Sequence, residues 1–304
     1  MQTPNFEHFL GLEELTKGEI LNLFSLAKKF KLSNKKHSLL NGKTVVNLFC
    51  EPSTRTRTSF EIAAKRLSAD VVNLNPDASS FLKGESLKDT INNLCAMQVA
   101  AIVVRHKVSG IPYLISRYAK AAIINAGDGA HEHPTQGLLD TFTLYERFGD
   151  LKSLNVTIVG DIAFSRTARS NIWALKKLGA NVTVCGPKTL IPSGIEKMGV
   201  KVTYNIKDAI KNADVLNVLR IQLERQEQKF FPSLNEYATY FGVTQNLLDK
   251  HGKEKILIMH PGPINRNIEL SDEVADSPNS VILEQVTNGV FIRMAVLVSS
   301  VCAK

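Results

Sequence analysis

The chain has few cysteines and no long apolar run. Its four cysteines are far apart, with no C-x-x-C pair and no histidine at ligand spacing, which argues against a disulfide framework and a zinc site. No segment approaches about 18 uninterrupted apolar residues, and the N-terminus has no apolar signal-peptide core, so neither a membrane span nor a signal peptide is expected. We therefore expect a cytoplasmic protein with reduced thiols and no metal.

Nucleotide and nucleic-acid motifs are also missing. The P-loop pattern G-x-x-x-x-G-K-[ST] is absent, and Gly160, which follows a strand-like run, does not begin a G-x-G-x-x-G pattern. The net charge is +8, but the basic residues are scattered apart from residues 28–36, where no aromatic residues are interleaved. That segment is interpreted as the solvated end of a helix over 19–30, so no nucleic-acid partner is expected.

The chain is long enough for two domains, and its pattern predicts the same class for both. It has 304 residues, of which 44% are hydrophobic, so each half can bury a core. Strand-like and helix-like runs alternate throughout, which predicts an α/β fold of two doubly wound domains with parallel sheets. The strand-like runs are 44–49, 70–74, 100–105, 121–125, 155–159, 181–185, 201–204, 213–219 and 256–259.

A helix is expected to bridge the two domains. Apolar residues at helical spacing over 136–148 are followed by Gly149, a plausible helix terminator. We expect domains at 1–148 and 149–288, with a C-terminal helix over 289–304 packing back on the first domain.

The most informative motif is Ser53-Thr54-Arg55-Thr56-Arg57-Thr58, which lies between a strand-like run and a helix-like run. A helix that begins there directs free backbone N–H groups and the positive end of its dipole at one point. The two arginines add planar cations that match phosphate or carboxylate. In isolation an ordinary helix cap with solvated arginines fits this segment better than an anion site, but the other segments of the chain reverse that preference.

Four further segments carry polar residues after strand-like runs, where α/β proteins bind ligands. Arg105 ends one run, and the glycine-rich segment 125–136 brings His133 and Gln136 to the start of the bridging helix at Pro134. Lys83 lies on a loop rich in turn-forming residues. In isolation Arg105 fits a cap at the sheet edge, and the Lys83 loop fits an ordinary surface loop. The second half contributes Gly160, Asp161, Arg166, Arg220, Gln222, Arg225 and 260–263.

These residues together predict a protein that holds one phosphate-bearing and one carboxylate-bearing ligand. No Ser-His-Asp set, pair of catalytic carboxylates or metal cage is recognisable. Group transfer through positioning and charge stabilisation is the chemistry that remains.

The chain resembles the aspartate and ornithine carbamoyltransferase family over nearly its whole length. Three signatures of that family appear in order, at 53–57 with 59–61, at 83–86 with Asp89 and Thr90, and at 133–136. The ornithine branch is expected to show His-Cys-Leu-Pro and Ser-Met-Gly, whereas this chain has His-Pro-Gly-Pro at 260–263 and no Ser-Met-Gly. The resemblance therefore favours the aspartate branch and implies carbamoyl transfer from carbamoyl phosphate to L-aspartate, a step of pyrimidine synthesis, without a cofactor.

The resemblance also implies roles for individual residues. Arg105 would complete a phosphate clamp, Thr56, Arg105 and His133 would polarise the carbamoyl carbonyl, and Arg166 would bind the α-carboxylate of aspartate. Glu51 and Arg225 resemble residues that exchange salt bridges during domain closure. The catalytic set is Arg55, Thr56, Arg105, His133 and Lys83; the carbamoyl-phosphate set is Ser53, Thr54, Arg55, Thr56, Arg105, His133, Gln136, Gly262 and Pro263; the aspartate set is Lys83, Arg166, Arg220 and Gln222.

The resemblance further implies a homotrimer with shared sites, in which Ser79 and Lys83 reach the site of the neighbouring chain. A regulatory chain or a dihydroorotase-like partner remains open. Leu82 and Gly262 replace residues that other relatives carry. Two alternatives are retained: a carbamoyltransferase for another amino acid such as ornithine, and a catalytically silent subunit that binds anions.

Overall fold

The computed structural model describes residues 4–33, 35–74, 85–222 and 233–302. The chain divides into two compact units, which are described separately. Unit 1 comprises Met1–Leu139 and Thr287–Lys304, and unit 2 comprises Asp140–Val286. The sequence placed the divisions after residues 148 and 288. The structure divides the chain nine residues earlier in the first case, inside α5 (Pro134–Phe148), and two residues earlier in the second, within α11 (Ile282–Val301).

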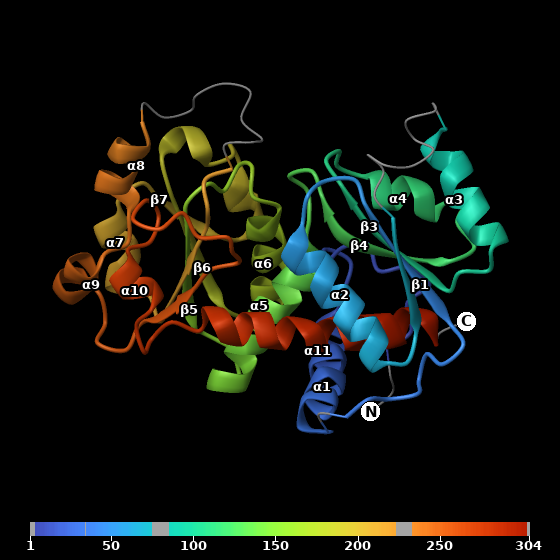
Figure 1. The fold of residues 1–304 in the computed structure, drawn as a ribbon. Helices are drawn as coiled ribbons and strands as arrows, with labels where there is room; N and C mark the ends of the chain where they lie inside the picture. Colours follow the sequence, from blue (N-terminus) through green and yellow to red (C-terminus); the bar gives the residue numbers. More distant parts are fainter. Residues whose placement is uncertain (1–3, 34, 75–84, 223–232, 303–304) are drawn as a thin grey trace. The chain divides into compact units, whose positions relative to one another are not determined.

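Unit 1 is built on a sheet of four strands, β1 (Thr44–Phe49), β2 (Asp70–Leu74), β3 (Ala101–His106) and β4 (Ala122–Asp128). Their order is β2-β1-β3-β4, and every ladder is parallel. Apolar side chains of β1, β3 and β4 pack with α3 (Leu87–Ala96) and α4 (Ile111–Ser116) on one face (Figure 1). Helices α1 (Lys17–Ser33) and α2 (Thr54–Arg66) also belong to this unit.

Unit 2 has a sheet of five strands in the order β7-β6-β5-β8-β9, again with parallel ladders. One core gathers apolar residues of β5, β6, β8 and β9 with those of α7, α9 and α10. The strands are β5 (Asn155–Val159), β6 (Asn181–Cys185), β7 (Lys201–Thr203), β8 (Val215–Val218) and β9 (Leu257–Met259). The helices are α6 (Arg166–Lys177), α7 (Ile206–Lys211), α8 (Leu234–Phe241), α9 (Gln245–His251) and α10 (Asp272–Ala275), with short 3-10 helices η3 (Lys188–Leu190) and η4 (Ile195–Met198).

The burial of the strands explains why their sequences are largely apolar, the pattern that is typical of a parallel sheet. Five of the six residues of β1 and all seven of β4 are buried, because parallel sheets are covered on both faces and their strands are apolar throughout. The edge strand β2 leaves three of its five residues exposed. The predicted fold class, two α/β domains with parallel sheets, is confirmed.

Two helices run from one unit into the other. The first, α5 (Pro134–Phe148), begins at the predicted proline, and Gly149 after it adopts φ 73°, a conformation in which glycine ends helices readily. The second, α11 (Ile282–Val301), begins seven residues before the expected start at Gly289. By length and composition α11 could cross a membrane, but 67% of its most apolar window is buried within the protein, which is typical of a core helix.

Candidate active site

In unit 1 the phosphate-type motif at 53–56 follows β1, at the point where the order of the strands in the sheet reverses. From β1 the chain proceeds to β2 on one side, whereas β3 lies on the other side of β1. The loops after β1 and β3 therefore diverge at the carboxyl edge, which is where open α/β sheets bind ligands. Phe49 at the end of β1 is paired with Arg105 at the end of β3. This register brings Arg105 next to the loop that leads to Ser53.

The start of α2 has the features of an anion site. Ser53 occupies the N-cap position, but among the described residues its side chain makes no capping hydrogen bond. The first N–H groups of a helix have no partner within the helix, so those of Thr54 to Thr56 remain available to a ligand. Arg55 on this turn is exposed, whereas Thr56 is buried. The predicted set at 53–56 is thus continuous along one helix terminus.

Arg105 is held in place beside that terminus. Its Nε donates to Glu51 Oε1 at 2.7 Å, and its Nη1 donates to Thr56 Oγ1 at 3.3 Å and to the carbonyl oxygen of Ala126 at 3.4 Å. Only 13% of the Arg105 side chain is exposed. The structure therefore brings together Thr56 and Arg105, two predicted residues from separate segments. The pairing of Glu51 with Arg105 was not predicted, because it depends on the strand order.

His133 and Gln136 lie at the start of α5, as expected. His133 directly precedes Pro134, and its carbonyl oxygen accepts from the backbone N–H groups of Gln136 (2.9 Å) and Gly137 (3.1 Å). The His133 and Gln136 side chains are both largely buried, with 5% and 8% exposed. Both predicted residues, His133 and Gln136, therefore lie buried in unit 1 at the start of α5.

The loop that carries His133 is organised by Asp128, a buried residue that sequence reasoning had assigned no role. Its carboxylate accepts from Asn125 Nδ2 (2.9 Å), Gly110 N (2.7 Å) and Glu132 N (3.2 Å), and it lies 3.1 Å from His131 Nδ1. Burial alone would raise the pKa of Asp128, but the bonds from His131, Asn125 and Gly110 outweigh it and lower the pKa. Asp128 is thus a fixed anion that shapes the loop.

In unit 2 the strand order reverses between β5 and β8, and the predicted carboxylate-binding residues lie in the segments that follow these two strands. The two strand ends approach very closely, because a Cβ on Gly160 would lie 2.6 Å from the Leu219 carbonyl oxygen. Gly160 also adopts φ 133°, a conformation that disfavours other residues. A glycine is therefore required where these loops meet.

Asp161 connects the two loops that carry the arginines. Its buried carboxylate accepts from Phe164 N at 3.0 Å, in the loop after β5, and from Gln222 N at 3.1 Å, in the loop after β8. Arg166 is the first residue of α6 and is 2% exposed, whereas Arg220 follows β8. The structure thus brings Arg166, Arg220 and Gln222 to neighbouring strand ends.

The remaining predicted residues have different outcomes. Gly262 and Pro263 follow β9, the strand next to β8. Ser79, Leu82, Lys83 and Arg225 lie outside the described residues. Within the described ranges, no three His, Cys, Asp or Glu side chains gather closely enough to hold a metal ion.

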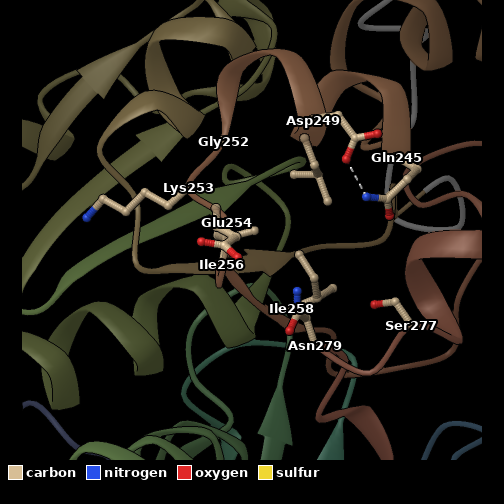
Figure 2. Close-up of a pocket in the computed structure, with 10 residues that line it drawn as sticks. Gln245, Asp249, Gly252, Lys253, Glu254, Ile256, Ile258, Ser277 and Asn279 are labelled. Carbon is tan, nitrogen blue, oxygen red and sulfur yellow. Dashed lines mark hydrogen bonds between the residues drawn. The ribbon is translucent and has the colours of Figure 1, made fainter.

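A separate pocket lies beside α9 and β9 (Figure 2). Its lining includes Gln245 and Asp249, which share a hydrogen bond of 2.7 Å, and Lys253 and Ile256, which precede β9. None of the residues that line it belongs to the predicted sets. The pocket is therefore distinct from the predicted residues at the carboxyl ends of the strands.

Comparison with protein families gives two adjacent matches. The carbamoyl-P binding domain of aspartate/ornithine carbamoyltransferase matches residues 7–146, and the Asp/Orn binding domain of the same family matches residues 152–300. The first match contains the predicted carbamoyl-phosphate set apart from Gly262 and Pro263, and the second contains the predicted aspartate set apart from Lys83.

Eight curated relatives at 50–56% identity share one name. The aspartate carbamoyltransferase catalytic subunit of Endomicrobium trichonymphae is 56% identical over 297 residues, covering 96% of this chain and 95% of the relative. That of Cytophaga hutchinsonii is 53% identical over 301 residues, covering 98% of each chain.

Solved structures of both branches resemble the fold equally well. Ornithine carbamoyltransferase from Pyrococcus furiosus has a TM-score of 0.88 at 31% identity, covering 99% of each chain. Aspartate transcarbamoylase from Trypanosoma cruzi, in complex with N-(phosphonacetyl)-L-aspartic acid, also has a TM-score of 0.88 at 31% identity, covering 99% of this chain and 97% of that one. The family matches and the relatives agree with the resemblance seen in the sequence: the chain belongs to the aspartate/ornithine carbamoyltransferase family.

Proposed function

We propose that the protein transfers the carbamoyl group of carbamoyl phosphate to the α-amino group of L-aspartate, giving N-carbamoyl-L-aspartate and phosphate, a step of pyrimidine synthesis. The observation that carries the proposal is the set of relatives at 50–56% identity over at least 95% of this chain, all named aspartate carbamoyltransferase catalytic subunits. The residues of the two units give this reaction a physical basis.

Unit 1 binds the phosphate in this proposal. The helix terminus at 53–56 contributes backbone N–H groups and hydroxyls, and Arg55 and Arg105 contribute cations. A dianion at a helix N-terminus interacts favourably with the dipole and with the unpaired N–H groups. The ion pair with Glu51 and the contact with Thr56 support a clamp role for Arg105, because they orient its guanidinium before the ligand arrives.

The same unit would polarise the carbamoyl carbonyl. Thr56, Arg105 and His133 would direct donors at the oxygen on which negative charge grows as the amine attacks. Each fixed donor of this kind typically lowers the activation free energy by ~3–4 kcal/mol. Gln136 and the carbonyl oxygens of Gly262 and Pro263 would hold the carbamoyl NH₂ group, which fixes the direction of attack.

Unit 2 would bind aspartate through its two carboxylates. Arg166 takes the α-carboxylate, Arg220 and Gln222 take the β-carboxylate, and Lys83 of a neighbouring chain assists. Guanidinium forks match carboxylates in a bidentate manner. The same cations would repel the cationic side chain of ornithine, which favours aspartate over the ornithine alternative.

The chemical step then needs no cofactor. The amine nitrogen forms a bond to the carbamoyl carbon, the bond from that carbon to the phosphate oxygen breaks, and the departing phosphate accepts the proton that the amine loses. Holding both substrates in contact contributes about 7–11 kcal/mol through saved entropy. Positioning and charge stabilisation are therefore sufficient sources of catalysis.

Product formation with two amino acids tests this function. Purified protein is given carbamoyl phosphate with L-aspartate or L-ornithine, and the ureido product is measured, with Arg55→Ala as the control. Turnover with aspartate alone, abolished in the control, is expected. Turnover with ornithine alone would favour the other branch of the family. Binding of phosphate without turnover of either amino acid would favour a silent subunit.

The assembly proposed for this enzyme is a homotrimer in which Ser79 and Lys83 complete the site of the neighbouring chain. A lysine in a loop rich in turn-forming residues, together with the family resemblance, supports this arrangement. Mixing inactive Lys83→Ala with inactive Arg55→Ala after mild dissociation should restore part of the activity, because hybrid trimers contain sites with both native residues. No recovery, with hybrids verified by mass, would contradict shared sites.

A further inference from the structure

A buried histidine and a buried glutamate lie behind the turn at 260–263 in unit 2. His260 follows β9 and is 1% exposed, and Glu269 is fully buried. The turn itself reaches the surface, since Pro263 is exposed. Neither His260 nor Glu269 touches a substrate in the proposed mechanism. Burial of two ionisable side chains is costly unless each is bound in place, so their contacts are informative.

The contacts of the imidazole define its protonation. His260 Nδ1 accepts a hydrogen bond from Gly262 N at 2.8 Å. Its Nε2 lies 3.3 Å from Glu269 Oε1, an oxygen that also accepts from Asn265 N at 2.6 Å. Because Nδ1 accepts, the proton of a neutral ring is on Nε2, where it faces the carboxylate. The ring therefore joins two backbone positions on either side of Pro263.

The backbone of His260 is fixed from the opposite direction. Its N–H donates to Gln285 Oε1 at 3.0 Å, and Gln285 Nε2 donates to Asp140 Oδ1 at 2.7 Å. Asp140 Oδ2 in turn accepts from Asn171 Nδ2 at 2.8 Å, on α6. A buried polar network with satisfied members is rigid. This chain of bonds ties the turn to α6, the helix that begins at Arg166.

We propose that His260 is a positioning residue for the carbamoyl group: its Nδ1, held by the contact of Nε2 with Glu269, fixes the Gly262 amide so that the carbonyl oxygens of Gly262 and Pro263 meet the carbamoyl NH₂. This inference rests on the proposed function. His260 itself contacts no substrate. His260 therefore affects the binding of ligands that have an amide NH₂ group, whereas the binding of phosphate alone does not depend on His260.

Two isosteric variants separate this role from simple packing. In His260→Asn the amide oxygen takes the place of Nδ1 and still accepts from Gly262. In His260→Gln the amide nitrogen takes the place of Nε2 and still donates to Glu269, but the acceptor for Gly262 is lost. His251→Gln, at the end of α9, is the control for an unrelated histidine.

Calorimetric titration of the full-length variants with phosphonoacetamide and with inorganic phosphate tests the proposal. Phosphonoacetamide retains the amide NH₂, whereas phosphate does not. His260→Gln should raise the dissociation constant of phosphonoacetamide at least about tenfold more than His260→Asn does. The dissociation constant of phosphate should change less than about twofold in both variants. Equal losses in the two variants, or parallel losses for the two ligands, would overturn the proposal.

The wild-type protein offers an independent test that needs no variant to fold. Nitrogen-15 NMR of labelled histidine distinguishes the two neutral tautomers and the imidazolium. A signal of His260 with the proton on Nε2 is expected, whereas the other tautomer or a doubly protonated ring would overturn the assignment. If wild-type protein makes no N-carbamoyl-L-aspartate and binds no phosphonoacetamide, it is the proposed function itself that fails.

Discussion

At the scale of the residue, Arg105 shows how a permanently charged group is held in a fixed orientation while it is largely buried. Glu51 compensates its charge, and Thr56 and the Ala126 carbonyl oxygen fix its plane. Arginine cannot lose its proton in a protein and presents donors in a rigid fork. The residue is therefore oriented in advance for an oxyanion, and little reorganisation is needed when the ligand binds.

Removing this side chain should reduce the chemical step. Arg105→Ala is expected to lower kcat about 10²–10³-fold, because one fixed donor to the developing oxyanion is lost. Steady-state kinetics with carbamoyl phosphate and L-aspartate measure the change. Arg117→Ala, an exposed arginine in the same unit, is the matched control and should behave as wild type. A kcat within about threefold of wild type for Arg105→Ala would contradict the proposed role.

Asp161 acts at the same scale by holding the two arginine-bearing loops together. Asp161→Ala removes the acceptor for both Phe164 N and Gln222 N, and bonds to charged groups typically contribute about 1.5–3 kcal/mol each. We expect kcat/KM for aspartate to fall at least about 10²-fold while phosphate binding to unit 1 changes little. Exposed Asp208, changed to alanine, is the control. An unaltered kcat/KM would show that the loops need no such connection.

The sequence indicates the groups that face ligands, and it singles out Glu51 and Asp161, but it does not reveal which residues these two hold. Arg105 and Arg220 stand out because they lie at the ends of strand-like runs, where α/β proteins bind ligands. Glu51 and Asp161 gain their roles only when β1 neighbours β3 and β5 neighbours β8. That adjacency is a property of the sheet and is not encoded in the local pattern.

At the scale of the element, the loop between β4 and α5 is a compact turn around one carboxylate. Gly129 illustrates its tightness, since a Cβ there would lie 2.7 Å from the backbone nitrogen of Ser109. The Asp128 carboxylate adds bonds from the backbone N–H groups of Gly110 and Glu132 to the backbone bridge between Asp128 and Glu132. The position of His133 at the end of this loop depends on that organisation.

The loop should make stability depend on pH in a defined direction. The pKa of Asp128 is lowered from 3.8 in the folded protein, so its carboxylate contributes stability that is complete above about 3.8 and is lost as the pH falls through the lower, folded pKa. Asp128→Asn should lower the free energy of unfolding by about 1.5–3 kcal/mol near neutral pH, and the difference should shrink in acid.

Urea unfolding of both proteins from neutral pH down to acid measures this difference. The control is Asp70→Asn, an exposed position on β2, which should leave the free energy of unfolding nearly unchanged. A deficit for Asp128→Asn that is independent of pH would contradict the account of the loop.

Helix α11 shows why element boundaries are harder to predict than elements. Its first turns contain Glu284, Gln285 and Asn288, which interrupt the apolar pattern that identified the helix from Gly289 onward. Gln285 and Asn288 are nevertheless buried, and they are bonded to Asp140 and Lys31. Polarity satisfied by tertiary contacts cannot be distinguished from solvent exposure in the sequence.

At the scale of the whole molecule, the chain combines two sheets, each with predicted residues at or after the ends of the two strands between which the strand order reverses. The first half supplies the phosphate-type residues and the second half supplies the carboxylate-type residues. The chain divides inside α5 and α11, whereas the sequence placed the first division at the end of α5 and the second two residues later within α11. Each of the two helices belongs in part to both units, which a linear pattern does not reveal. The account therefore requires both halves to act on one reaction.

Calorimetric titration with N-(phosphonacetyl)-L-aspartate tests that claim most directly, because this ligand joins a phosphonate to an aspartate. Wild type, Arg55→Ala in unit 1, Arg166→Ala in unit 2 and the control Arg117→Ala are compared. Tight binding by wild type and the control, with losses of at least about 10²-fold in each of the other two variants, is predicted. Binding that depends on only one of the two arginines would contradict a site to which both units contribute.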